Sequence, residues 1–231
     1  MTEPRDPSES LQPMPVPNWL DQVCEALHEP TAHRSGLPYT AAEVPFVAVH
    51  HWHAGAVADL IGEATGRRGV DAAPHDAVRA VHARAAAGEA IGEHAWSAVL
   101  EPALADVYRL AYPREQVHSR ASSAAASFAR SRGWFEGEAE HYGETYARLN
   151  TEVSERVHAE ANALANAAAY SAAFASHDAE DYARAWPFAM VRAWIAAYSG
   201  PADTDGSAAR EARTRLRDGL VDAVGRARVS R

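Results

Sequence analysis

Alanine content is the feature that most constrains how this chain can fold, because 53 of its 231 residues are alanine. Alanine has the highest helix propensity of any residue, and stretches such as AEANALANAAAYSAAFA leave little room for strand propensity. We therefore predict an all-α fold. The expected architecture is an alanine-rich multi-helix bundle with closely packed, crossed helices.

A four-residue spacing supports this prediction. One column of polar and aromatic residues consists of Tyr142, Tyr146, Asn150, Ser154, His158, Asn162, Asn166 and Tyr170, and a second consists of Tyr182, Trp186, Met190, Trp194 and Tyr198. Because a helix turns every 3.6 residues, such columns wind around the helix and do not form a coiled-coil seam. Rows of this spacing are the ridges that interdigitate when globular helices cross at about −50°.

The charge and the cysteine content exclude several classes of protein. A formal charge of −9 and a pI of about 5.7 argue against binding to nucleic acid or to an anionic membrane. The N-terminal segment has no signal-peptide pattern, and no apolar run approaches the length of a membrane span. The one cysteine, Cys24, cannot form an internal disulfide, which fits a reducing compartment. We expect a cytoplasmic protein.

The chain divides into three parts. Residues 1–17 contain five prolines among small polar and acidic residues, so we expect a disordered arm. Residues 18–200 are expected to form one helical bundle domain, and 201–231 a linker followed by an amphipathic C-terminal helix. That last helix carries Leu216, Leu220 and Val224 on one face.

Capping and breaking residues predict the helix positions. In the first half of the chain we expect a helix at 19–28, and a second that begins at a Thr40–Glu43 capping box and runs to Gly66. A third should begin at Pro74, be weakened at Gly88 and Gly92, and bend near Pro102. Further helices are expected from Pro113 to about Gly133, at 135–176 and at 178–199. The 135–176 segment would be about 60 Å long if unbroken, more than a compact domain of this size comfortably holds. We therefore predict a break or bend, at Asn150–Thr151 in preference to Gly143.

Polar residues of the first column and aromatic residues of the second could line a ligand-binding pocket. Asn150, Ser154 and His158 lie within about 12 Å along a helix and could converge on one ligand. The competing interpretation is hydrogen bonding between helices for the polar column and core packing for the aromatic column. The candidate ligand-binding residues are Tyr146, Asn150, Ser154, His158, Asn162, Trp186 and Trp194.

Two Glu-x-x-His pairs, Glu138 with His141 and Glu155 with His158, have the spacing used by dimetal helical bundles. They are the candidate ligands of a divalent metal. On one continuous helix, however, the pairs would lie about 25 Å apart, and they could share ions only if the chain folded back near Asn150.

Other histidines offer weaker candidates. His50 and His53, in the sequence HHWH, could supply two metal ligands, whereas His75, His82 and Glu89 are too widely spaced to share an ion. Surface or hydrogen-bonded histidines are the alternative. Motifs of the commonest nucleotide-using and acyl-transfer enzymes do not occur in the sequence.

Residues 75–200 resemble an alanine-rich helical family of streptomycetes that includes the spectinomycin-cluster protein SpcZ. The resemblance is carried by the segments EHAWSAVLEPALADVYRLAYP, YARLNTEVSERVHAEANALANAAAY and DYARAWPFAMVRAWIAAY. It implies an actinomycete setting and a role in specialised metabolism, without a particular activity. The spacing of Asn150, Ser154 and His158 also resembles the metal motif of class I terpene synthases, but His158 stands where that motif has glutamate, and no aspartate-rich partner motif precedes it.

These observations favour an accessory or small-molecule-binding helical protein. One alternative is a metal-dependent enzyme with Glu and His ligands from several helices, and another is a structural or partner-binding protein. A homo-oligomer is compatible with each of these functions.

Overall fold

The computed structural model describes residues 17–28 and 39–229, and the proline-rich arm expected at 1–17 lies almost wholly outside them. Within the described residues every regular element is helical, which confirms the all-α prediction. None of the described helices is long and apolar enough to cross a membrane.

The N-terminal part consists of α1 (Trp19–Leu27), the 3₁₀ turn η1 (Ala41–Glu43), and a continuous helical run formed by α2 (Val47–Trp52), η2 (His53–Val57) and α3 (Ala58–Arg67). Asn18 caps α1 by accepting a hydrogen bond from the backbone N–H of Asp21. The predicted capping box is present at Thr40 and Glu43. The segment η2 is a π-helical turn, a wider turn that often occurs at functional sites.

Two helices follow, α4 (Ala73–Ala86) and α5 (Glu93–Ala111). Pro74 lies in the first turn of α4, where its missing N–H costs no hydrogen bond. The helix α5 continues through Pro102 to Ala111.

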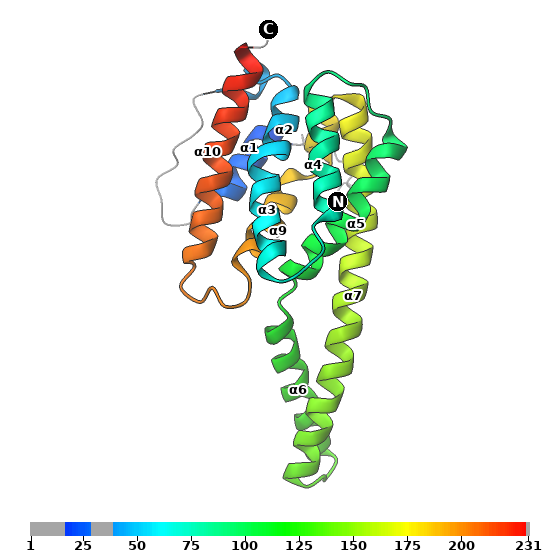
Figure 1. The fold of residues 1–231 in the computed structure, drawn as a ribbon. Helices are drawn as coiled ribbons and strands as arrows, with labels where there is room; N and C mark the ends of the chain where they lie inside the picture. The colour runs from blue at the N-terminus through cyan, green and yellow to red at the C-terminus, as the bar shows by residue number, and fades with distance from the viewer. Residues whose placement is uncertain (1–16, 29–38, 230–231) are drawn as a thin grey trace, which may run out of the picture.

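The next two helices, α6 (Arg114–Ser131) and α7 (Glu136–Ser176), form a hairpin, and the predicted break near Asn150–Thr151 is wrong. The helix α7 is 41 residues long and unbroken. It packs against α6 over its first half and against α5 over its second half. Because α7 projects beyond the body of the protein, its length is not limited by the diameter of a compact domain (Figure 1).

The chain ends with α8 (Ala179–Arg184), α9 (Pro187–Ser199) and α10 (Ser207–Val229). Trp186 separates α8 from α9 and adopts the left-handed conformation with a φ of 61°, directly before Pro187. The amphipathic prediction for α10 is confirmed, because Leu216, Leu220 and Val224 are all buried. Their face packs against α2, η2 and α9.

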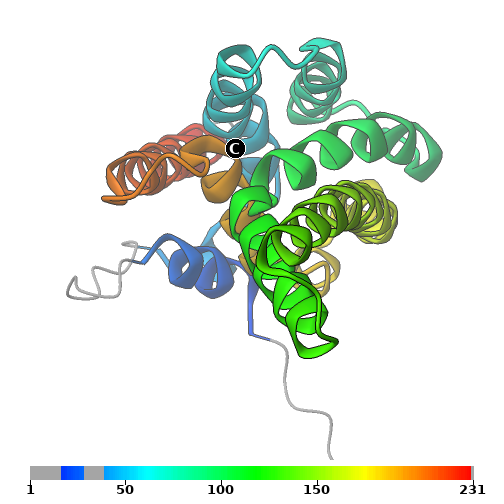
Figure 2. The same cartoon turned by 90° about the horizontal axis from the view of Figure 1, so that it is seen from below.

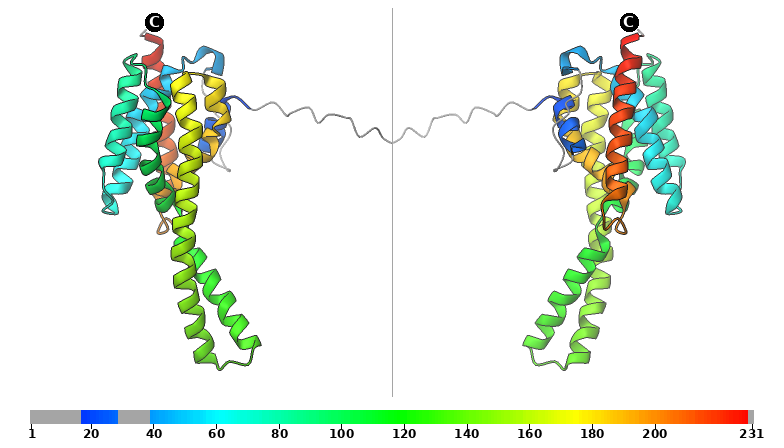
Figure 3. Two further views of the ribbon diagram at one scale, coloured as in Figure 1. Left: turned by 90° about the vertical axis from the view of Figure 1, so that its right-hand side faces the viewer. Right: turned by 90° about the vertical axis from the view of Figure 1, so that its left-hand side faces the viewer.

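The body of the molecule holds the core, and the α6–α7 hairpin extends away from it (Figures 1 and 3). Viewed from below, the other helices surround α9, which runs through the middle of the body (Figure 2). Four of the five residues in the second predicted column, Tyr182, Met190, Trp194 and Tyr198, are buried there. Trp186 is the exception and is 48% exposed.

Candidate ligand site in the core

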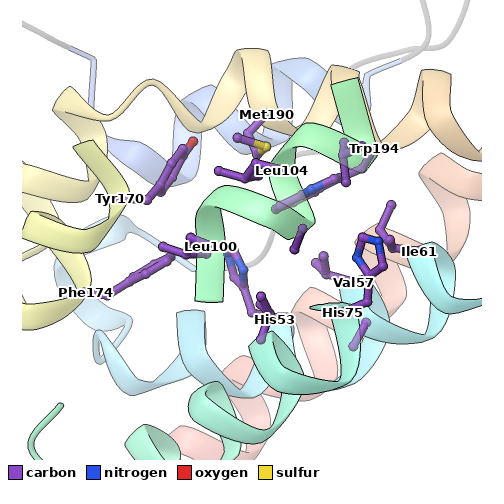
Figure 4. Close-up of a pocket in the computed structure, with 14 residues that line it drawn as sticks. His53, Val57, Ile61, His75, Leu100, Leu104, Tyr170, Phe174, Met190 and Trp194 are labelled. Atoms are coloured by element: carbon purple, nitrogen blue, oxygen red, sulfur yellow. The ribbon is translucent and has the colours of Figure 1, made fainter. Parts of the chain in front are cut away.

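A cavity of about 50 Å³ lies in the core between η2, α3, α4, α5, α7 and α9. Fourteen residues line it, and twelve of them are buried. A single water molecule needs roughly 10–15 Å³ on this measure, so the cavity has room for a larger occupant. Most of its wall is apolar, and Figure 4 shows Leu100, Leu104 and Trp194 approaching it from α5 and α9.

Two buried polar atoms in the cavity wall lack a hydrogen-bond partner within the described residues. They are the hydroxyl of Tyr170, on α7, and Nε2 of His75, on α4. Nε2 of His75 lies 3.7 Å from the Asp106 carboxylate, which is too far for a hydrogen bond. Because buried polar groups in native proteins are nearly always paired, these atoms mark places where an occupant could bind.

Protonation states of these two groups follow from burial. Burial, reinforced by the nearby Tyr182 and Tyr108, raises the pKa of Tyr170 well above its usual value, so its hydroxyl keeps its proton and can donate. Burial lowers the pKa of His75 and outweighs the opposing effect of Asp106. At neutral pH two of the residues that line the cavity therefore carry a protonated phenol and a neutral imidazole.

One side of the cavity adjoins three buried imidazoles, which we call the imidazole cluster: His50 on α2, His53 on η2 and His82 on α4. Nδ1 of His50 lies 3.0 Å from Nδ1 of His82, and the rings of His53 and His82 stack with centroids 4.4 Å apart. His53 also lines the cavity, so the cluster and the cavity are contiguous.

The contact between His50 and His82 fixes their tautomers relative to each other. A neutral imidazole has one donor and one acceptor nitrogen, so one Nδ1 donates and the other accepts. The two Nε2 atoms must then be one donor and one acceptor, and neither has a hydrogen-bond partner within the described residues. The cluster thus holds one unmatched donor and one unmatched acceptor.

The π turn η2 places His53 in the cluster and Val57 in the cavity wall. Nε2 of His53 lies 3.1 Å from the hydroxyl of Tyr182, which links η2 to α8. The preceding residue, Trp52, donates its indole N–H to the carbonyl of Leu216, 2.9 Å away on α10. These contacts hold η2 from both sides, so His53 has a fixed position.

Burial also determines what chemistry the imidazole cluster can perform. Burial, followed by the effect of nearby histidines, lowers the pKa of His50 and of His53 to about 3. The pKa of His82 is lowered well below its usual value for the same reasons. An imidazole with such a pKa is a poor proton acceptor at pH 7, since efficient general bases have pKa values near the working pH. The cluster is suited to hydrogen bonding rather than to proton transfer.

Of the seven candidate ligand-binding residues, the structure places only Trp194 at the cavity. The polar candidates on α7 lie outside it: Tyr146 and His158 are exposed, and Asn150, Ser154 and Asn162 are half-buried. The Asn162 amide donates to the His158 carbonyl one turn earlier in the same helix, at 2.7 Å. None of these polar side chains lines the core cavity.

The candidate metal ligands are not brought together either. Glu138 and His141 lie near the start of α7, and Glu155 and His158 lie 17 residues further along the same unbroken helix, which is about 25 Å. Glu155 instead pairs with Arg114 of α6. Among the described residues, no three His, Cys, Asp or Glu side chains are arranged to hold a metal ion.

Sequence reasoning identified some cavity residues and missed others. His50, His53, His75 and His82 were singled out, yet their spacing gave no sign that α2, η2 and α4 bring three of them into contact. Tyr170 was recognised only as the last member of a column. The sequence feature that could have identified Tyr170 is its position in an alanine-rich segment, four residues before Phe174. Phe174 also lines the cavity.

Comparisons with known proteins add no further constraint on the site. No protein-family model, curated protein or solved structure matches the chain.

Proposed function

We propose that this protein binds a small, mostly apolar organic molecule that carries a hydroxyl or carbonyl group, and that it does so in the core cavity. The observation that carries the proposal is the cavity itself, which is lined by apolar residues together with Tyr170 and His75. The Tyr170 hydroxyl and the His75 Nε2 have no hydrogen-bond partner within the described residues. Ligand sites are typically apolar cavities with a few polar groups that orient the ligand.

Energetics favour an occupied cavity. Each buried polar group without a partner costs about 1–3 kcal/mol, and a ligand that pairs with one of them recovers part of this free energy. The apolar part of the ligand would replace contacts that are missing across the cavity. Met190 contributes a flexible thioether side chain to the wall, so the wall can yield to a ligand larger than the cavity volume of about 50 Å³.

Binding is a better proposal than acid–base catalysis for this site. His50 and His53 have pKa values near 3, and Tyr170 has a pKa well above its usual value. None of these groups would exchange a proton readily at neutral pH. The resemblance of residues 75–200 to the streptomycete family supports an accessory role in specialised metabolism as part of the same proposal, with a cytoplasmic location.

The direct test is a calorimetric titration with phenol and with toluene, which have similar shapes and differ in the hydroxyl. We expect phenol to bind about tenfold more tightly, the equivalent of one net hydrogen bond of about 1.4 kcal/mol. Tyr170→Phe should remove most of this preference. The matched control is Tyr198→Phe, because the Tyr198 hydroxyl is bonded to Glu211 away from the cavity and its loss should leave the preference unchanged.

A second variant tests the place of binding. Ala103 lines the cavity from α5, and Ala103→Leu should fill it and abolish binding of both compounds. Ala98→Leu, on an exposed position of the same helix, is the control and should bind like the parent protein. Equal affinities of the parent protein for phenol and toluene, or unchanged binding in Ala103→Leu, would refute the proposal.

A further inference from the structure

In the part of the chain that the structure describes, the α6–α7 hairpin leaves one face of α7 uncovered. The hairpin projects from the body, and α6 packs along α7 on one side only (Figures 1 and 3). The buried side of α7 in this region consists of small residues, among them Ala139, Gly143 and Ala147. The large apolar residues of the same helix therefore lie elsewhere.

Six of these residues form what we call the α7 stripe: Tyr142, Tyr146, Leu149, Val153, Val157 and Leu164. Tyr142 is half-buried, and the other five are between 46% and 60% exposed. At 100° per residue, all six point within roughly 45° of one direction on the helix. From Tyr142 to Val157 they form a continuous apolar face, and the exposed Glu160 separates this face from Leu164. Such a face usually marks an interaction site.

The α7 stripe is symmetric about its own middle. A two-fold axis that crosses the helix between Leu149 and Asn150 would relate each position to one at the same distance on the other side. It would relate Tyr146 to Val153 and Tyr142 to Val157. The same axis would relate Leu164 to Phe135, the 80%-exposed residue at the start of the helix. The stripe position Leu164 is thus related by this axis to Phe135, at the tip of the hairpin.

We propose that two copies of this chain associate through the α7 stripe, with the two α7 helices antiparallel about a two-fold axis near Leu149 and Asn150. In a two-fold interface, residue i of one copy meets residue j of the other, and residue j meets residue i. In the stripe this condition places Tyr146 opposite Val153, Tyr142 opposite Val157 and Leu164 opposite Phe135, and Leu149 meets Asn150 at the axis. A different protein as partner would not require the symmetry.

The expected dimer is weak. The stripe and Phe135 extend over residues 135–164, about 43 Å, and a helix is roughly 10 Å wide, which gives about 430 Å² of contact per copy. The total of roughly 860 Å² is below the size of stable interfaces and in the range of transient ones. Between residues 136 and 164, α7 also carries seven glutamates against two arginines, so the two copies repel each other at low salt. Raising the salt concentration should therefore strengthen association.

Cross-linking tests the antiparallel arrangement. In a Cys24→Ser background, Leu149→Cys lies beside the axis and should give covalent dimers with a short bismaleimide. Tyr142→Cys alone should not, because its counterpart in the other copy lies about 22 Å along the axis. A mixture of Tyr142→Cys and Val157→Cys chains should cross-link to each other. Efficient cross-linking of Tyr142→Cys to itself would overturn the antiparallel arrangement.

Sedimentation equilibrium tests association itself. We expect a monomer–dimer equilibrium that tightens several-fold between low and high salt, and the double variant Leu149→Glu, Val153→Glu should weaken it at least tenfold. The double variant Ala161→Glu, Ala165→Glu adds the same charge at exposed positions of α7 outside the stripe and should cause a much smaller change. A parent protein that stays monomeric up to millimolar concentration overturns the proposal, as does a dimer that the double variant leaves intact.

Discussion

Gly219 shows how a single residue can determine the distance between two elements. It lies on α10 where that helix crosses η2, and a Cβ atom added to it would overlap the side chain of Ala56. The same helix contains Gly225, where an added Cβ would meet nothing within 4 Å. The close approach at Gly219 is what lets the Trp52 indole reach the Leu216 carbonyl and hold η2.

Substitution of these two glycines should have opposite effects. Gly219→Ala should lower the free energy of unfolding by about 1–3 kcal/mol, as overpacking in a well-packed core does. Gly225→Ala should raise it by about 0.5–1 kcal/mol, because alanine favours the helix and nothing obstructs its methyl group. Urea denaturation measures both, and a stabilised Gly219→Ala protein would contradict the close approach.

At this scale the sequence predicts residue types better than their partners. Trp194, a candidate ligand-binding residue, lines the cavity, and the buried positions on α10 followed from a simple apolar pattern. Tyr170 could not be recognised as unpaired, since this depends on what α5, α8 and α9 place around its hydroxyl. The contact of His50 with His82 likewise joins residues 32 apart in the chain.

Among the elements, α7 connects the two parts of the molecule. Its buried residues wind around it at a spacing of four, from Ala139 through Gly143, Ala147 and Thr151 to Ala159, Ala163 and Ala167. This buried face contacts α6 along the first half of α7 and α5 along the second half. Each half of the helix has its own partner, so a polar pair at Asn150–Thr151 does not end it.

Gly143 should be essential to the hairpin. A Cβ atom there would lie 2.6 Å from the Ser122 carbonyl oxygen and 3.0 Å from Cβ of Ala126, so α6 would have to move away. Gly143→Ala should therefore increase amide hydrogen exchange in α6 and in residues 136–150, while the body stays protected. Gly137→Ala, on the same helix with open space around it, should not. Unchanged exchange in Gly143→Ala would show that the two helices do not approach so closely.

Most helices were predictable, because proline, glycine and capping residues act locally. The capping box at Thr40–Glu43, Pro74 in the first turn of α4 and the end of α9 before Gly200 are examples. The break predicted in α7 was wrong because it assumed that every helix must fit within a compact body. Chain length and composition do not reveal a projecting hairpin.

For the whole molecule, burial of the imidazole cluster makes stability depend on pH. The pKa values of His50, His53 and His82 are depressed in the folded state, so their contribution to stability is present above the unfolded pKa of about 6.5. It is lost as the pH falls through the folded pKa values, which are about 3 for His50 and His53. Below pH 6.5 the unfolded chain binds up to three more protons than the folded protein at these residues.

The free energy of unfolding should therefore decrease with a slope that approaches about 4 kcal/mol per pH unit, about 1.4 for each histidine. Urea denaturation at pH 7, 6 and 5 measures this slope, and His82→Leu should reduce it by about a third. Stability that is constant over this range would mean that the cluster is accessible to protons in the folded protein.

Binding in the core cavity is the central claim, and a crystal structure of the protein at saturating phenol tests it most directly. We predict phenol in the cavity beside Trp194 and Met190, with its hydroxyl hydrogen-bonded to Tyr170 or His75. The cavity should otherwise keep its shape apart from a change in the Met190 rotamer. A cavity without phenol in crystals where the compound is bound elsewhere, or a core closed by solid packing, would contradict the claim.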